Sequence, residues 1–178
     1  MAIDVNHHST GDYHDNGWSR AKLHITLPWI KPTAGGIRLL LYTVGYQGRS
    51  LPEMTDLLAS RGITLVVDVR ERPYSKKRGF SKDELKEALA EKNIKYRSMP
   101  LLGAPPKLRQ KVKEGGSYQE FFQLYREHLK QQQQALLELK QLVPQEVTCL
   151  LCYEKDPDFC HRTVIAQEIS TPENTVPL

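Results

Sequence analysis

The sequence lacks the features that mark a membrane protein or a disulfide-stapled scaffold. Its longest apolar runs are shorter than ten residues, whereas a helix needs roughly 18 apolar residues to span a bilayer. No basic segment followed by an apolar one opens the chain, as a secretory signal would. Three cysteines in 178 residues are too few, and odd in number, for a disulfide framework. We therefore expect a protein of the reducing cytoplasm without a membrane partner.

An excess of charge of one sign is also missing. The chain carries 25 Lys and Arg against 21 Asp and Glu, a formal net charge of +4. This balance permits a nucleotide or nucleic-acid partner, but it favours one only where the cations cluster. Hydrophobic residues make up 39% of the chain and charged residues 26%, which is typical of one globular domain of this length.

Residues 1–36 differ from the rest of the chain. They hold scattered His, Gly, Asn and Asp without a sustained apolar period. We expect a poorly ordered or loosely docked leader at 1–36, in which residues 23–30 alternate briefly and could add an edge strand. An α/β domain is expected at 37–170, followed by a C-terminal tail at 171–178.

Apolar segments alternate with helix-start signals between residues 37 and 170. Apolar, β-branched runs predict strands at residues 37–44, 64–69, 94–99 and 147–152. Capping boxes, a serine followed three residues later by a glutamate, predict helix starts at Ser50, Ser81 and Ser117. The last of these opens one long amphipathic helix over residues 117–143. The pattern predicts a three-layer α/β domain, with a mostly parallel sheet of about four strands and helices on both faces.

The segment at 147–162 places reactive side chains directly after a buried strand. Asp156 followed by Pro157 predicts a helix start. Cys152, Cys160 and His161 then lie at the carboxyl end of a strand, where open α/β sheets bind their ligands. These three are the candidate catalytic residues. We expect Cys160 to be the nucleophile with a depressed thiol pKa, because we place it in the first turn of the helix beside His161.

Loops after the other strands bring polar and aromatic side chains to the same edge. The candidate residues for binding an anion or substrate are Tyr46, Gly48, Arg49, Asp68, Arg70, Arg72, Tyr74, Glu154, Lys155 and Arg162. We expect Arg70 and Arg162 to bring their guanidinium groups to a phosphate-like anion. The alternative is that Asp68 and Glu154 neutralise them. A small anionic ligand is possible, and the tyrosines could stack on a base, which favours a nucleotide or nucleic acid over a bare oxyanion.

Four motifs, taken together and in order, resemble the domain of unknown function 488 family. They are TVGYQGRS at 43–50, VDVRERPYS at 67–75, GFS at 79–81 and LLCYEKDPDFCHR at 150–162. The resemblance extends over about residues 38–170 and implies a compact α/β fold, but it brings no reaction with it. Residues 66–71 also resemble the strand and Asp-x-Arg of rhodanese domains, and Cys152 is similar in place to their sulfur-carrying cysteine. Residues 153–157 are bulky and partly acidic, unlike the small residues of the rhodanese loop.

The candidate site also has structural and metal-binding interpretations. Cys152 could simply end a buried strand, and His161 and Arg162 could hold strand-end carbonyls. A zinc site from Cys152, Cys160 and His161 is the weaker interpretation, because the sequence shows neither a CxxC pair nor a fourth ligand. We therefore predict no metal, and the sequence names no cofactor.

Three classes of function remain. The favoured one is an enzyme with a cysteine and arginine anion site, acting on a phosphorylated or nucleotide-like substrate. The alternatives are a non-catalytic nucleotide or nucleic-acid binding module, and a protein-interaction domain in which the Cys-His-Arg motif is structural.

Overall fold

The computed structural model describes residues 30–33 and 36–178. The leader predicted at 1–36 therefore lies largely outside the described residues, as does most of the edge strand predicted at 23–30. Strands β1 (Ile30–Thr33) and β2 (Gly36–Leu39) pair antiparallel with each other in a two-stranded sheet of their own.

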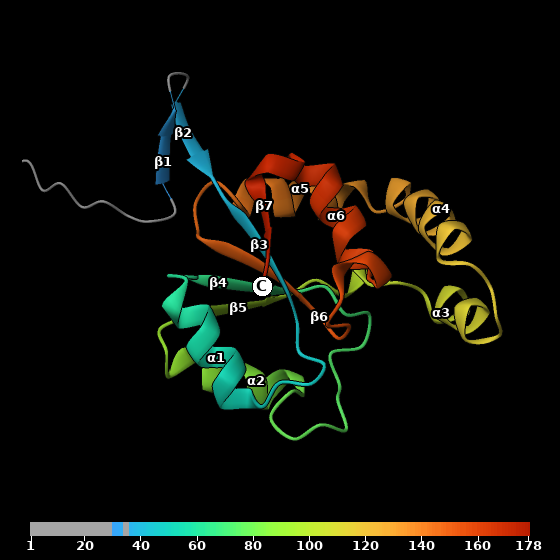
Figure 1. The fold of residues 1–178 in the computed structure, drawn as a ribbon, viewed down its shortest axis with the longest axis horizontal. Helices are drawn as coiled ribbons and strands as arrows, with labels where there is room; N and C mark the ends of the chain where they lie inside the picture. Colours follow the sequence, from blue (N-terminus) through green and yellow to red (C-terminus); the bar gives the residue numbers. More distant parts are fainter. Residues whose placement is uncertain (1–29, 34–35) are drawn as a thin grey trace, which may run out of the picture.

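The main sheet has five strands, all parallel to their neighbours, in the order β5-β4-β6-β3-β7 (Figure 1). Their bounds are β3 Leu41–Gly45, β4 Leu65–Asp68, β5 Lys95–Ser98, β6 Thr148–Cys152 and β7 Thr175–Pro177. The predicted parallel α/β sheet is confirmed. The strand count exceeds our expectation by one, because residues 175–177, which we expected to be part of a tail, pair with β3 along the edge of the sheet.

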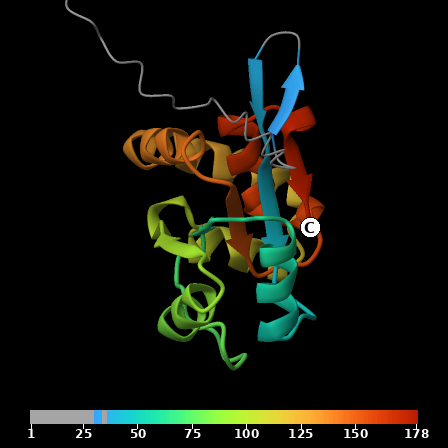
Figure 2. The ribbon, with the colours of Figure 1, turned by 90° about the vertical axis from the view of Figure 1, so that its left-hand side faces the viewer.

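Helices cover both faces of this sheet, as predicted (Figures 1 and 2). The α-helices are α1 Leu51–Ser60, α2 Lys82–Ala90, α3 Pro106–Lys113, α4 Tyr118–Lys130, α5 Gln133–Leu142 and α6 His161–Ile169. The 3-10 helices are η1 Pro100–Leu102, η2 Pro157–Phe159 and η3 Pro172–Asn174. Helices α1 and α2 pack on one face through Met54, Leu58, Leu85 and Leu89. Helices α4, α5 and α6 pack on the other through Tyr125, Leu129, Leu139 and Ile165.

The continuous apolar strands explain why this arrangement forms. Every residue of β3, β4 and β6 is buried, as a parallel strand covered by helices on both faces requires. Strand β5, in contrast, alternates exposed and half-buried positions, which suits its place at the edge of the sheet. The core consequently lies in two layers, one on each side of the central strand β6.

The three predicted capping boxes differ in outcome. At Ser50 both halves form, since its hydroxyl accepts from the Glu53 amide and the Glu53 carboxylate accepts from the Ser50 amide. At Ser117 the hydroxyl accepts from the amide three residues on. The helix start predicted at Ser81 is correct, since Ser81 is the N-cap of α2, but the capping box does not form there because its hydroxyl donates instead to the carbonyl of Ser75 in the preceding loop.

The single helix predicted over residues 117–143 is also wrong. Helix α4 ends at Lys130, and α5 begins at Gln133 after a short turn. A straight helix of that length would extend about 40 Å at 1.5 Å per residue, beyond the diameter of a small domain. The turn lets the apolar stripes of both halves reach the same core. Within residues 30–33 and 36–178, none of the helices has the length and apolar composition needed to cross a membrane.

Candidate functional site

The segment after β6 bends back on itself before α6 begins. Asp156 caps a short 3-10 helix, η2, by accepting from the Asp158 amide at 2.9 Å. Helix α6 starts only at His161, and Cys160 is its N-cap in an extended conformation. The predicted helix start at Asp156 is therefore correct only for the 3-10 turn. Our placement of Cys160 in a first helical turn is wrong.

Four side chains from this segment form one cluster, the Cys-Glu-His cluster, made of Cys152, Glu154, Cys160 and His161, of which all but the half-buried Glu154 are buried. One carboxylate oxygen of Glu154 accepts from the thiols of both Cys152 and Cys160, each at 3.1 Å. The Nδ1 atom of His161 lies 3.8 Å from the Cys152 sulfur, and its Nε2 lies 2.9 Å from the Val69 carbonyl oxygen. Since a carbonyl can only accept, Nε2 carries the proton and the Nδ1 lone pair of a neutral ring faces the sulfur.

The surroundings of the cluster determine the charge of its members. Burial raises the pKa of the Cys160 thiol well above its usual value, and the adjacent Cys152 raises it further. Our prediction of a depressed Cys160 pKa is therefore wrong, because desolvation outweighs the nearby imidazole. Burial alone would raise the pKa of Glu154, but hydrogen bonds from the Cys160 and Cys152 thiols lower it overall. Burial alone would lower the pKa of His161, but Cys160, the Val69 carbonyl and Glu154 raise it overall.

A close approach between the ends of β3 and β6 holds the loop that carries Glu154. A Cβ atom on Gly45 would lie 1.7 Å from the Glu154 carbonyl oxygen, so only glycine fits at this position. Two residues further along the chain, the backbone N–H of Gln47 donates to the backbone carbonyl of Tyr153 at 2.9 Å. The glycine turn at residues 45–48 thus holds the loop that carries the cluster.

Arg162 secures the same loop from the other side. Its guanidinium donates to the carbonyl oxygens of Glu154 and Lys155, and the side chain is fully buried. Its Nε atom is the one buried side-chain nitrogen or oxygen without a hydrogen-bond partner among the described residues. Arg162 therefore donates to backbone carbonyls. Contrary to our expectation, its buried position gives it no access to an anion at the open edge of the sheet.

Arg70 and Asp68 form a buried network at the end of β4. The Asp68 carboxylate accepts from Nε and from the second terminal nitrogen of Arg70 at 2.8 and 2.6 Å, and from the Tyr96 hydroxyl at 2.6 Å. The remaining nitrogen of Arg70 donates to the Tyr46 hydroxyl and the Phe80 carbonyl. Burial would lower the pKa of Arg70, but Asp68 raises it overall. Burial and Asp68 both raise the pKa of Tyr96, which keeps its proton for the hydrogen bond. All three guanidinium nitrogens of Arg70 are thus committed, as our alternative interpretation described.

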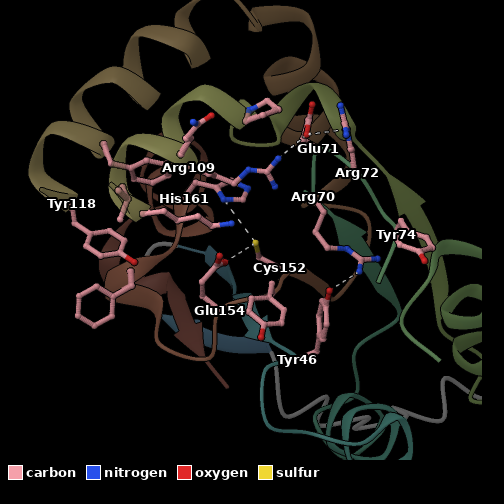
Figure 3. A pocket seen from close by; sticks show the side chains of 17 residues that line it. Tyr46, Arg70, Glu71, Arg72, Tyr74, Arg109, Tyr118, Cys152, Glu154 and His161 are labelled. Atoms are coloured by element: carbon pink, nitrogen blue, oxygen red, sulfur yellow. Dashed lines mark hydrogen bonds and ion pairs between the residues drawn. The ribbon is translucent and has the colours of Figure 1, made fainter. Parts of the chain in front are cut away.

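A pocket of about 800 Å³ opens over the Cys-Glu-His cluster (Figure 3). Its floor is formed by residues that follow β3, β4 and β6, namely Tyr46, Arg70, Glu71, Arg72, Tyr74, Cys152, Tyr153, Glu154, Phe159 and His161. The helical pair α3 and α4 supplies the opposite wall with Pro106, Arg109, Gln110, Val112, Lys113, Tyr118 and Phe121. The pocket lies at the carboxyl edge of the parallel strands, where the sequence predicted a ligand site.

The predicted site residues divide into two groups. Those that line the pocket are Tyr46, Arg70, Arg72, Tyr74, Cys152, Glu154 and His161. Those that do not are Gly48, Arg49, Asp68, Lys155, Cys160 and Arg162. Cys160 reaches the site only through the Cys-Glu-His cluster, and Asp68 only through Arg70.

The sequence prediction missed the wall formed by α3 and α4. Arg109 and Lys113 of α3 and the rings of Tyr118 and Phe121 of α4 all line the pocket. The available signal was the run of four cations at alternate positions in residues 107–113, which we did not treat as an element. Tyr118 and Phe121 also belong to the apolar stripe of α4. Their spacing in the sequence therefore could not show whether they pack in the core or line a pocket.

Comparison with known proteins places the chain in one family. The family model described as "Domain of unknown function DUF488" matches residues 50–169, which is two thirds of the sequence. The match includes the Asp68 to Tyr74 loop and the Cys-Glu-His cluster, and it begins just after the glycine turn at 45–48. No curated protein and no solved structure matches the chain. On the family match and the motifs that carry it, the chain belongs to the DUF488 family.

Proposed function

We propose that the protein is an enzyme that binds a small anionic ligand with a planar ring, such as a nucleotide, and acts on it at the Cys-Glu-His cluster. The pocket volume of about 800 Å³ falls within the range of 300–1,000 Å³ usual for small-molecule sites. Three members of the cluster, Cys152, Glu154 and His161, line this pocket. A bound ligand would therefore contact a thiol, a carboxylate and an imidazole at once.

The observation that carries this proposal is the gathering of partly exposed rings around the pocket. Among the described residues, the large hydrophobic side chains that remain exposed are Tyr74, Leu101, Tyr118, Leu137, Tyr153 and Phe159. Four of these six are aromatic, and all four line the pocket. Exposed apolar groups that cluster in a hollow, rather than scatter over a surface, mark a binding site. Aromatic faces of this kind stack on nucleobases and other planar rings.

Cations on the pocket wall supply the preference for an anion. Arg72, Arg109 and Lys113 line the pocket with donors not committed to Asp68, against the carboxylates of Glu71 and Glu154, whereas Arg70 is already paired with Asp68. Arg109 donates to Glu71 at 2.8 Å, and Arg72 lies 3.7 Å from the same carboxylate. Both arginine side chains are substantially exposed, so a phosphate can reach them. A ligand phosphate would compete with Glu71 for Arg109, and the geometry of a guanidinium favours a bidentate contact.

The shape of the site favours a small ligand over a nucleic-acid strand. The aromatic rings and the cations meet in one hollow between the sheet edge and α3–α4, rather than along an extended face. Proteins that bind single strands instead track the backbone along a charged groove. A single-stranded oligonucleotide is therefore the contrasting ligand for this proposal.

We expect nucleotides to stabilise the protein more than either of their parts. A ligand at 100 times its dissociation constant stabilises the native state by about 2.7 kcal/mol, which corresponds to a rise in Tm of roughly 5–10 °C for a chain of this size. The measurement is a thermal-shift series with nucleoside mono-, di- and triphosphates, nucleosides, inorganic phosphate and a single-stranded oligonucleotide. The proposal predicts a shift with a nucleotide and little with phosphate or nucleoside alone. An equal or larger shift with the oligonucleotide would favour the binding-module alternative, and no shift with any of them would remove the proposal.

A further inference from the structure

We infer that Cys152, Cys160, His161 and Glu154 form a zinc-binding site at the floor of the pocket. The sequence offered three ligands without a fourth, and the bend after β6 brings in Glu154 as the missing one. One ligand atom from each residue lies within 4.8 Å of all the others. The inference deepens the proposed function and rests on it for the catalytic use of the metal, whereas zinc binding itself needs no substrate.

The distances fit a tetrahedral ion. Bonds of about 2.3 Å to sulfur and about 2.0–2.2 Å to nitrogen or oxygen place neighbouring ligand atoms of a tetrahedral zinc roughly 3.3–3.8 Å apart. Here the Glu154 oxygen lies 3.1 Å from each sulfur, and the His161 Nδ1 lies 3.8 Å from the Cys152 sulfur. The other pairs of ligand atoms lie within 4.8 Å of each other, so movements of up to about 1 Å would bring all four into tetrahedral range, and the two thiol protons would leave.

The histidine is oriented as a metal ligand requires. Its Nε2–H donates to the Val69 carbonyl at 2.9 Å, so Nδ1 faces the other three ligand atoms with a free lone pair. Such a hydrogen bond from the far ring nitrogen to a carbonyl is the usual support of a metal-bound histidine, because it sets both tautomer and ring orientation. Two sulfurs and an imidazole select zinc over magnesium or calcium, which prefer oxygen ligands.

The charge of a zinc-loaded cluster is compatible with the buried Arg162. It is fully buried, and its hydrogen-bond partners are the carbonyls of Glu154 and Lys155 rather than a carboxylate. Within the described part of the chain its Nε has no partner at all. A buried cation without a counter-ion is costly. Zinc with two thiolates and one carboxylate carries a net charge of −1, since two positive charges meet three negative ones. Ionised Glu154 with two protonated thiols gives the metal-free cluster the same charge, so the ion would add no positive charge near the loop that Arg162 holds.

The position of the cluster gives the metal a use. Cys152, Glu154 and His161 line the pocket, while Cys160 is buried and does not line it. Glu154 is the half-buried member on the pocket side, so it is the ligand that a water molecule or a substrate atom would replace. Three protein ligands with one exchangeable position are the arrangement of catalytic rather than structural zinc.

The test is the zinc content of the full chain after removal of metal and reconstitution with zinc alone. Elemental analysis should give about one zinc per chain for the wild type and for Cys149→Ser, whose cysteine is buried in β6 outside the cluster. The double variant Cys152→Ser/Cys160→Ser should lose more than ninety percent of that zinc. Substoichiometric zinc in the wild type, or equal zinc in the double variant, would overturn the site.

A second measurement on the wild type avoids the risk that the double variant fails to fold. Alkylation by iodoacetamide, mapped by peptide mass spectrometry, should modify Cys152 or Cys160 in metal-free protein and neither in zinc-loaded protein. Modification at the same rate with and without zinc, or a Cys152–Cys160 disulfide that forms in the presence of zinc, would count against the site. The nucleotide series run on both forms separates the two proposals. Zinc binding without a nucleotide shift keeps the metal site and removes the proposed substrate, and a nucleotide shift without zinc binding does the reverse.

Discussion

Replacing Asp68 by asparagine should cost the protein about 3–5 kcal/mol of its free energy of unfolding, the usual loss when one partner of a buried ion pair is removed. The Asp68 side chain is fully buried and that of Arg70 nearly so. Asparagine keeps the shape and one acceptor, but it leaves the Arg70 charge without compensation at the pocket floor. The Tyr96 hydroxyl also loses a charged acceptor at 2.6 Å. Urea unfolding of the variant beside the wild type measures the loss.

The matched control is Asp56→Asn. Asp56 pairs with Lys92 at 2.7 Å, close to the Asp68–Arg70 distance, but its side chain is 65% exposed. Exposed pairs contribute about 0–1 kcal/mol because water and salt screen them. Equal losses for the two variants would show that the Asp68–Arg70 network is as solvated as a surface pair, which would contradict its role as a rigid floor for the pocket.

Replacing Arg162 by methionine should cost about 3 kcal/mol, because two carbonyl oxygens in the loop after β6 lose their donors. Methionine fills a similar volume, so the loss reports hydrogen bonding more than packing. The Glu154 loop should also relax, and any ligand of the pocket should bind more weakly. Arg162→Lys should recover part of both losses, since its ammonium can still donate to one of the carbonyls.

Arg97→Met is the control for Arg162. Arg97 pairs with Glu138 on the surface, and both side chains are substantially exposed. We expect a loss below about 1 kcal/mol there. Unfolding by urea and ligand binding are measured for all three variants. If Arg162→Met unfolds like the wild type and binds equally well, the guanidinium does not position the loop.

The fold could be predicted because its signals are local. Each central strand is a continuous apolar run, and the capping box at Ser50 marks the start of α1 directly after a strand. Parallel strands all end at one edge, so the convergence of Tyr46, Arg70 and Cys152 followed from the order of the elements alone. The same rule located the pocket without any knowledge of its far wall.

The orientation of the charged side chains could not be predicted from the sequence. Arg162 points inward because it donates hydrogen bonds to two carbonyl oxygens of the bent loop after β6. The loop can take this path because Gly45, which has no side chain, lets Glu154 approach closely. Arg70 is held by Asp68, as the sequence already allowed, but the Phe80 carbonyl that completes its shell comes from a distant loop. The pKa of the Cys160 thiol is raised rather than lowered as we expected, because its side chain at the N-cap of α6 is buried away from solvent.

The far wall depends on contacts that no local pattern reveals. Arg109 and Lys113 face the pocket because α3 packs against α4 across the sheet edge. The break between α4 and α5 has the same origin, since a compact core favours two shorter helices over one that overshoots it. Glu154 joined the cluster through the turn at Asp156, which places it between the two thiols.

The most direct test of the binding pocket is a calorimetric titration of the full chain with the nucleotide that gives the largest thermal shift. Arg109→Ala/Lys113→Ala removes two pocket cations, and Lys86→Ala/Lys140→Ala removes two exposed cations, on α2 and α5, that do not line it. Each lost contact to a charged group is worth about 1.5–3 kcal/mol, so the first variant should bind at least roughly 100-fold more weakly. The second should bind within about twofold of the wild type, because distant exposed charges are screened. Equal affinities for the two variants would contradict the pocket as the site of binding.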